Sequence, residues 1–390
     1  MLYPLSRITG ATYRRVVKPV LFRFAADSVH EAMIRSGARI QRVTPLLALS
    51  RTALRYDNPI LRQTVADVEF ASPLGLSAGL DKDSQIVKLA AAIGFGFSEC
   101  GSVTLHPYAG NPQPWYTRLP NSRSILVNAG LKSQGAAAVI DRIKHTYSPD
   151  FLATYPLNIS IAKTNSPQAA STKEAIADYV ECFRLFEAAN VARLYTLNIS
   201  CPNTYGGEPF TTPELLEQLL SALAKLKLTK PLFVKLPIDK SWHDTEALLD
   251  VAARYSYVVG ITIGNLRKDR RGVDLRDPLS PHQKGNLSGL PCREPSNHLL
   301  AHAYLSFGDR FVFSGVGGVF SAEDAYAKIR LGASLVEMVT GVIFGGPSIA
   351  GEINRGLARC LQTDGFDSIQ QAIGIDAKTY INDHTHTEST

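Results

Sequence analysis

The sequence predicts an α/β fold, a (β/α)8 TIM barrel with an N-terminal helical extension. From about residue 65 onward, short apolar runs alternate with amphipathic stretches, which is typical of repeated βα units and a parallel sheet. The pattern contains eight such units, and eight units fit a closed barrel better than an open sheet. The chain therefore divides into a basic helical segment (1–60), a barrel (61–362) and a polar C-terminal tail (363–390).

Each barrel unit pairs an apolar strand with a following helix. The strands are expected at 74–77, 97–100, 157–162, 194–200, 232–237, 258–263, 311–316 and 335–340. The helices are expected at 84–93, 134–146, 171–189, 213–227, 243–255, 293–306, 321–330 and 347–361. Start signals support two helices, Thr212-Pro213 and a Ser321 cap followed by Glu323. The polar stretch from Asp376 to Thr390 is expected to be a disordered tail.

Residues 1–60 interrupt the βα rhythm and concentrate the positive charge. They hold ten Lys and Arg against three acidic residues, in a chain whose net charge is +6. The pattern predicts two or three short helices that end near Asp57-Asn58-Pro59. A basic amphipathic helix can lie in a membrane interface, so we expect contact with an anionic membrane surface and no nucleic acid. A segment that only caps the barrel is the alternative.

Composition excludes several other classes. The cysteines lie far apart without a CxxC pair, which suits a reducing compartment and argues against disulfides or a zinc site. The nine histidines are scattered and form no HExxH pattern, so we expect no metal. No apolar run approaches the roughly 20 residues that a membrane-spanning helix needs. Arg7, Arg14 and Arg15 also interrupt any signal peptide. The protein is expected to be soluble or peripheral.

Catalytic groups of barrel enzymes lie at the C-terminal ends of the strands. The first strand leads into Ala78, Gly79 and Lys82, where small residues let a planar ligand approach and the lysine adds a fixed charge. A tight turn with a solvated lysine is the alternative. Glycine-rich turns near Gly289, after the seventh strand at Gly318, and beyond the eighth predict a phosphate cradle.

The fourth strand ends in a thiol between two carboxamides, Asn198, Cys201 and Asn203, and Asn265 follows the sixth strand. Carboxamides both donate and accept hydrogen bonds, so they can orient a polar planar ring. A thiol, with an unperturbed pKa of about 8.5, can act as a base if positive charge stabilises its thiolate. An isolated buried cysteine is more often a packing residue, but the position of Cys201 at a strand end favours chemistry.

Lys235 lies within an apolar run on the fifth strand. Burying a lysine is costly unless a negative partner meets it. An electron-rich flavin would supply that partner, and a salt bridge to a strand-end acid is the alternative. Taken together, the strand ends predict a phosphate-anchored flavin mononucleotide (FMN) that takes a hydride, opposite a base that takes a proton.

Seven motifs resemble those of the dihydroorotate dehydrogenases over nearly the entire chain. They are SAGLDKD (77–83), GSVT (101–104), LNISCPNT (197–204), VKLP (234–237), GNLSG (285–289), GVGG (315–318) and ASLVEMVTG (333–341). The segment VLFRFAADSVHEAM (20–33) resembles the helical extension of the membrane-associated, quinone-dependent class. The resemblance implies oxidation of dihydroorotate to orotate in pyrimidine (UMP) biosynthesis. The hydride would pass from C6 to FMN N5, the C5 proton to a base, and the electrons to a quinone. It also implies a monomer or homodimer, peripheral on the cytoplasmic face of a bacterial-type membrane or otherwise cytoplasmic.

On the matching positions, the resemblance implies Cys201 as the catalytic base. The implied substrate-binding residues are Lys82, which would pair with the orotate carboxylate, and Asn128, Asn198, Asn203 and Asn265. The implied FMN-binding residues are Ala78, Gly79, Lys82, Ser102, Ser160, Asn198, Lys235, Gly264, Gly289, Gly318, Val339 and Thr340.

Three positions depart from the family pattern. Cys201 is the base of the soluble class on a body that resembles the quinone class, which normally carries serine. The loop Asn128-Ala129-Gly130 is one residue shorter than usual after its Asn, and Ser160 stands where the family has Asn. Because thiols ionise more easily than alcohols, we expect activity to extend to lower pH than with a serine base.

Three other functions stay open. A soluble-class dihydroorotate dehydrogenase using fumarate or NAD is favoured by Cys201 and opposed by residues 1–60. A transfer-RNA dihydrouridine synthase is also a flavin barrel with a Cys-Pro motif, but it needs a large basic surface for RNA, and here the tail is acidic. A flavin-binding protein without turnover would explain the three departures, but such a binder does not need a base.

Overall fold

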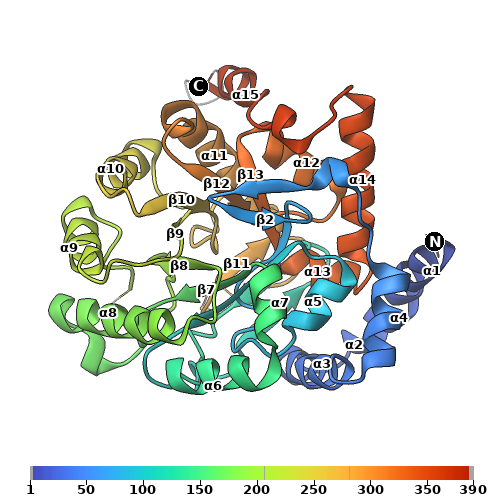
Figure 1. Ribbon diagram of the computed structural model, residues 1–390, viewed down its shortest axis with the longest axis horizontal. Helices are drawn as coiled ribbons and strands as arrows, with labels where there is room; N and C mark the ends of the chain where they lie inside the picture. The colour runs from blue at the N-terminus through green and yellow to red at the C-terminus, as the bar shows by residue number, and fades with distance from the viewer. Residues whose placement is uncertain (1–2, 206, 281, 386–390) are drawn as a thin grey trace.

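The computed structural model describes residues 3–205, 207–280 and 282–385, and its centre is a closed barrel of eight parallel strands (Figure 1). The strands are β3 (Leu74–Leu76), β4 (Phe97–Val103), β7 (Leu157–Ile161), β8 (Leu194–Asn198), β9 (Leu232–Leu236), β10 (Val258–Ile263), β12 (Val312–Val316) and β13 (Ala333–Met338). They follow one another around the barrel in chain order, and β13 pairs with β3 to close it. The predicted barrel is confirmed, and each predicted strand position holds one of these strands.

Helices surround the barrel at all the predicted places (Figure 1). They are α5 (Val87–Ile93), α6 (Ala136–Thr146), α8 (Thr172–Ala189), α9 (Pro213–Ala224), α10 (Trp242–Ala253), α11 (Arg293–Phe307), α12 (Ala322–Arg330) and α14 (Ile349–Thr363). The Ser321 side chain caps α12 by accepting a hydrogen bond from the backbone N–H of Asp324, as its start signal predicted. Two short helices, α7 (Pro149–Thr154) and α13 (Thr340–Gly345), were not predicted.

Two small antiparallel sheets lie outside the barrel. One is the hairpin of β1 (Gln63–Val65) and β2 (Val68–Phe70). The other joins β5 (Tyr116–Leu119), β6 (Ser124–Val127) and β11 (Asn286–Gly289), so the GNLSG motif forms a strand and not only a turn. Sequence reasoning missed both sheets because strands of three or four residues are too short to show a reliable period.

The β1–β2 hairpin seals one end of the barrel with aromatic rings. Phe70 meets Phe97, the first residue of β4, edge to face, with ring centroids 5.4 Å apart. Gly75 and Gly260 make room for these rings, because a Cβ at Gly75 would lie 2.2 Å from the Phe97 ring and one at Gly260 would lie 2.3 Å from Phe233. The hairpin and these rings form a plug against the N-terminal ends of the barrel strands. The open end of the barrel is therefore the one at the C-terminal ends of the strands.

The N-terminal segment folds as helices that lie against the barrel (Figure 1). They are α1 (Tyr3–Thr12), the π-helical η1 (Tyr13–Val17), α2 (Lys18–Leu21), α3 (Ala26–Ile40) and α4 (Thr44–Leu54). Helix α4 packs against α5, α1 against α14, and α3 against β5. The Asp27 carboxylate accepts hydrogen bonds from the backbone N–H groups of Trp115 (2.9 Å) and Tyr116 (3.0 Å). Within the part of the chain that the structure covers, no helix is long and apolar enough to cross a membrane.

The expectation of a disordered tail is wrong for residues 376–385. Helix α15 (Ala377–Thr385) packs against α11, and Arg330 forms ion pairs with both Asp364 and Asp376. The Tyr380 hydroxyl also donates to Glu294 (3.1 Å). The polar composition concealed this helix because its anchors are ion pairs made through space. The rest of the predicted tail, 386–390, lies outside the described residues.

Phe70 is expected to contribute strongly to the stability of the barrel. Replacing Phe70 with Ala should lower the free energy of unfolding by about 3–5 kcal/mol, because it leaves a cavity at a fully buried ring. Glu69→Ala on the same strand is the control and should stay within about 0.5 kcal/mol, because Glu69 is exposed. Urea unfolding measures both. Equal effects of the two changes would show that the hairpin does not seal the barrel.

Candidate active site

One cavity of about 360 Å³ opens at the C-terminal ends of the barrel strands and extends beneath the N-terminal helices. It brings together most of the site residues that the sequence predicted. They are Ala78, Gly79, Lys82, Ser102, Asn198, Cys201, Asn203, Lys235, Gly264, Asn265, Gly289, Gly318, Val339 and Thr340. The volume lies in the range of small-molecule sites, about 300–1,000 Å³.

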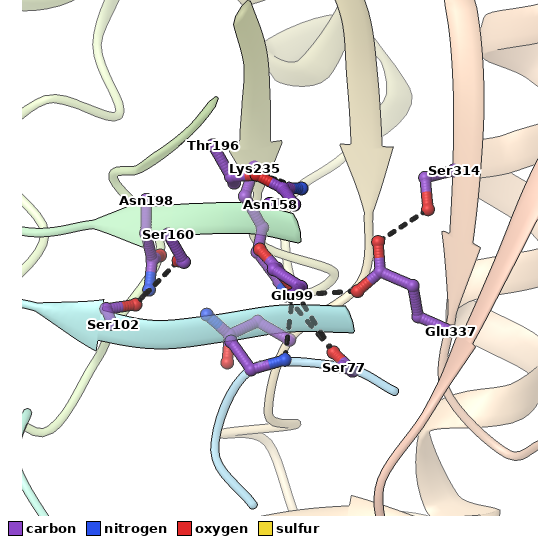
Figure 2. Close-up of polar contacts among 12 residues, drawn as sticks. Ser77, Glu99, Ser102, Asn158, Ser160, Thr196, Asn198, Lys235, Ser314 and Glu337 are labelled. Carbon is purple, nitrogen blue, oxygen red and sulfur yellow. Dashed lines mark hydrogen bonds and ion pairs between the residues drawn. The ribbon is translucent and has the colours of Figure 1, made fainter. Parts of the chain in front are cut away.

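Two predicted residues, Ser160 and Asn128, do not line the cavity. The Ser160 hydroxyl is buried behind Ser102, with 2.8 Å between the two oxygens, and Ser102 accepts a hydrogen bond from Asn198 Nδ2 at 2.7 Å (Figure 2). Asn128 instead accepts a hydrogen bond from Asn111 Nδ2 (3.3 Å). Ser160 therefore reaches the cavity only through Ser102, and Asn128 supports the loop around it.

The turn that carries Cys201 is held by carboxamides. Asn198 Oδ1 accepts from the backbone N–H (3.1 Å) and the hydroxyl (3.0 Å) of Ser200, while Asn265 Nδ2 donates to the carbonyl of Ser200 (2.7 Å). Asn203 Nδ2 donates to the carbonyl of Val127 (3.0 Å). Each amide has two N–H groups and two lone pairs, so these asparagines keep hydrogen-bonding capacity for a ligand.

Cys201 is a half-buried free cysteine that lines the cavity. Burial raises its pKa to about 11, although a backbone hydrogen bond from Asn203 and the charges of Lys82 and Lys163 oppose the shift. The positive charge that a thiolate at Cys201 requires is present, but burial outweighs it. Two cations do lie near the sulfur, but desolvation outweighs them.

Lys235 has carboxylate partners within the barrel. Its Nζ lies 2.8 Å from Glu99 Oε2 and 3.9 Å from Glu337 Oε2 (Figure 2). Lys235 thus has the salt bridge to buried acids that was the alternative, and it also lines the cavity. The rule that drew attention to Lys235, a charge inside an apolar strand, applies equally to Glu99 and Glu337 and would have found them.

Further polar residues that sequence reasoning missed also line the cavity, among them His30, Tyr116, Arg118 and Lys132. Lys132 Nζ lies 3.2 Å from Glu31 Oε1. Burial, with the charges of Lys82 and Lys132, lowers the pKa of His30 to about 3, so this imidazole is neutral. These residues come from the N-terminal helices, the outer sheet and the loop after β6, and a search of barrel strand ends does not cover these segments.

Glycines leave backbone open around the cavity. Gly79 has φ +112°, and a Cβ there would meet no atom within 4 Å, so the position opens directly into the cavity. Gly289 (φ +78°) and Gly318 (φ +72°) exclude side chains, since a Cβ would lie 2.4 Å from the Arg123 carbonyl oxygen or the Arg293 Cβ. Exposed backbone of this kind can receive a planar ring and a phosphate.

Comparison with known proteins places this geometry in a family. The family model described as dihydroorotate dehydrogenase matches residues 60–361. A dihydroorotate dehydrogenase (quinone) of Deinococcus deserti is 36% identical over 374 residues, covering 94% of this chain and 100% of that protein. One from Rhodococcus opacus is 34% identical, covering 92% and 98%. The crystal structure of Eimeria tenella DHODH in complex with ferulenol is similar with a TM-score of 0.79 at 25% identity, covering 92% and 98%.

The raised thiol pKa predicts slow alkylation. Labelling of Cys201 by iodoacetamide should be slow at neutral pH and accelerate as the pH approaches about 11, since only the thiolate reacts. Lys163→Met should move the curve to higher pH by removing a neighbouring cation. Mass spectrometry of the labelled peptide gives both curves. A rate that already levels off at neutral pH would contradict the assigned pKa direction.

Proposed function

The chain belongs to the dihydroorotate dehydrogenase family, and we propose that it oxidises dihydroorotate to orotate and passes the electrons to a quinone. One observation carries this proposal: a single cavity joins the barrel mouth around Cys201 to a passage under the N-terminal helices. The passage is lined by apolar side chains, among them Leu21, Phe22, Val29 and Met33. An apolar acceptor needs such a passage, whereas fumarate or NAD does not.

Enzymes of this family are flavoproteins, and we propose FMN as the cofactor. The chain's own residues fit it. Ala78 and Gly79 would lie against the ring, Lys235 would approach it from the cavity floor, and the backbone at Gly289 and Gly318 would hold the phosphate. When bound, FMN supplies a two-electron acceptor for the substrate and a two-electron donor for the quinone.

The residues around Cys201 suit a planar, anionic substrate. Lys82 would pair with the substrate carboxylate, and Asn198, Asn203 and Asn265 would bind the ring's amide edges through their remaining N–H groups and lone pairs. Cys201 Sγ would remove the proton from C5. Only the thiolate can accept that proton, so the thiol must first lose its own. Burial opposes this ionisation, and the charges of Lys82 and Lys163 favour it by lowering the pKa of Cys201.

The N-terminal helices suit a membrane surface. Several large apolar side chains on these helices are exposed: Leu5, Ile8, Val16, Val17, Val20, Met33, Leu46 and Leu49. Phe24 and Val43, in the turns between the helices, are exposed too. Basic residues of the same helices lie near them in sequence, which favours an anionic surface. We therefore propose that these helices dock peripherally on the cytoplasmic face of a membrane, where a quinone can enter the passage.

The direct test is purification with a visible spectrum, followed by anaerobic titration with dihydroorotate. The proposal expects a flavin spectrum that bleaches on addition of dihydroorotate and recovers with a quinone analogue, faster than with fumarate or NAD. Absence of bleaching would instead support a flavin-binding protein without turnover.

A cysteine variant tests the base. Cys201→Ala should retain flavin but slow its reduction by dihydroorotate by roughly 10²–10⁴-fold, measured by stopped-flow absorbance. Cys201→Ser should restore activity only at higher pH, because an alcohol ionises less readily. Cys360→Ala on α14 is the matched control, since Cys360 does not line the cavity, and it should leave the rate unchanged. Normal turnover by Cys201→Ala would exclude this residue as the base.

A charge on the N-terminal helices tests membrane docking. Phe24 is 62% exposed and does not line the cavity, so Phe24→Asp should weaken flotation with phosphatidylglycerol vesicles several-fold while dihydroorotate still reduces the flavin. Leu305→Asp introduces the same change at a 48% exposed leucine on α11 and should not affect flotation. Equal losses in both variants would argue against docking through the N-terminal helices.

A further inference from the structure

Three charged side chains meet inside the barrel, next to the cavity. They are Glu99 on β4, Lys235 on β9 and Glu337 on β13, with side chains 0%, 5% and 2% exposed (Figure 2). Lys235 and Glu337 also line the cavity. Two acids and one cation leave one unbalanced negative charge if all three are ionised, and an unbalanced charge in a dry interior is costly.

The two acids are bound unequally. Glu99 Oε2 accepts hydrogen bonds from Lys235 Nζ (2.8 Å) and from the backbone N–H of Ala78 (3.1 Å). Glu337 Oε2 lies farther from Lys235 Nζ, at 3.9 Å, and Glu337 Oε1 accepts a hydrogen bond from the Ser314 hydroxyl (2.7 Å). Glu99 is therefore the carboxylate partner of Lys235, and Glu337 is the more weakly compensated acid.

The second carboxyl oxygen of each acid indicates that a proton is shared between Glu99 and Glu337. Among the described residues, Glu99 Oε1 and Glu337 Oε2 have no donor, although both are fully buried. Both acids flank the same ammonium, with Glu99 Oε2 2.8 Å and Glu337 Oε2 3.9 Å from Lys235 Nζ (Figure 2). Two ionised carboxylates are both acceptors, so neither could supply the donor that the other lacks. A proton on one of the two acids supplies a donor and removes the unbalanced charge.

Electrostatics assign this proton to Glu337. Burial and the charge of Glu99 raise the pKa of Glu337 to about 8, against the opposing charge of Lys235. Burial alone would raise the pKa of Glu99 too, but the charge of Lys235 and hydrogen bonds from Glu337, Lys235 and Ala78 outweigh it and hold that pKa low. The titratable groups facing Glu337 are Glu99 and Lys235, while Ser314 contributes a hydroxyl.

We propose that Glu337 carries a proton at neutral pH, donates it to Glu99, and thereby acts as a positioning residue that holds the Lys235 ammonium on the cavity floor. The proposal rests on the proposed function, in which Lys235 faces the cofactor. With Glu337 protonated, the three side chains are neutral in sum. Ionisation of Glu337 leaves one negative charge beside the floor, which opposes the addition of electrons to a bound cofactor.

Infrared spectroscopy tests the proton without using enzyme activity. The holoenzyme at neutral pH should show the carbonyl band of a buried carboxylic acid in a wild-type-minus-Glu337→Gln difference spectrum. Because the pKa of Glu337 is raised, the acid form is present at neutral pH and should be lost as the pH rises through about 8. A difference spectrum without this band, or with a band unchanged at alkaline pH, would overturn the proposal.

The midpoint potential of the bound flavin tests whether ionisation of Glu337 opposes reduction of the flavin. In the wild type, a plot of potential against pH should bend to more negative values as Glu337 ionises. Glu337→Gln should keep the neutral-pH potential and lose the bend, because its amide can donate to Glu99 and accept from Ser314. Glu337→Leu, which can do neither, should shift the potential at neutral pH.

Controls distinguish a wrong role for Glu337 from unfolding of a variant and from a wrong proposed function. Glu69→Gln makes the same chemical change at an exposed site on β2 and should keep the wild-type bend. Flavin content and unfolding midpoints show that each variant is folded. A bend that persists in Glu337→Gln, or a wild-type potential in Glu337→Leu, contradicts the role of Glu337. A wild type that binds no flavin contradicts the proposed function instead, and the infrared band then still decides whether Glu337 is protonated.

Discussion

Parallel pairing between β13 and β3 closes the barrel, and the arrangement of the site depends on that closure. Glu337 lies on β13, Glu99 on β4 and Lys235 on β9, far apart in the sequence. In an open sheet these strands would not share an interior. In the closed barrel Lys235 Nζ lies 2.8 Å from Glu99 and 3.9 Å from Glu337, where a low dielectric makes both their attraction and their desolvation large. The protonation of Glu337 and the position of the Lys235 ammonium therefore depend on each other.

The two ends of the barrel follow opposite physical requirements. At the N-terminal ends of the strands, Phe70, Phe97 and Phe233 fill the interior, and Gly75 and Gly260 give up side chains to admit them. At the C-terminal ends, glycines and carboxamides leave space and hydrogen-bonding capacity. Stability is thus concentrated at the sealed end, while the open end accepts strained backbone and buried charge.

The reactive thiol illustrates the same balance. Cys201 lies near two lysines, an arrangement that by itself would lower the pKa of a thiol. Burial in the same cavity opposes this effect and prevails in the protein without ligand. A negatively charged substrate would raise the pKa of the thiol further. The pKa of Cys201 with substrate bound therefore depends on how strongly Lys82 and Lys163 still interact with the sulfur.

Local patterns along the chain predict the barrel, the positions of its strands and main helices, and the strand ends that line the cavity. Hydrophobic periodicity and turn residues are local signals, so they can be read without a structure. Those patterns do not predict the partners of Lys235, the place of Ser160 behind Ser102, the displacement of Asn128 from the cavity, or the ordering of α15 by Arg330. These depend on contacts between residues distant in the chain, and the energy of a buried charge is set by what surrounds it in space.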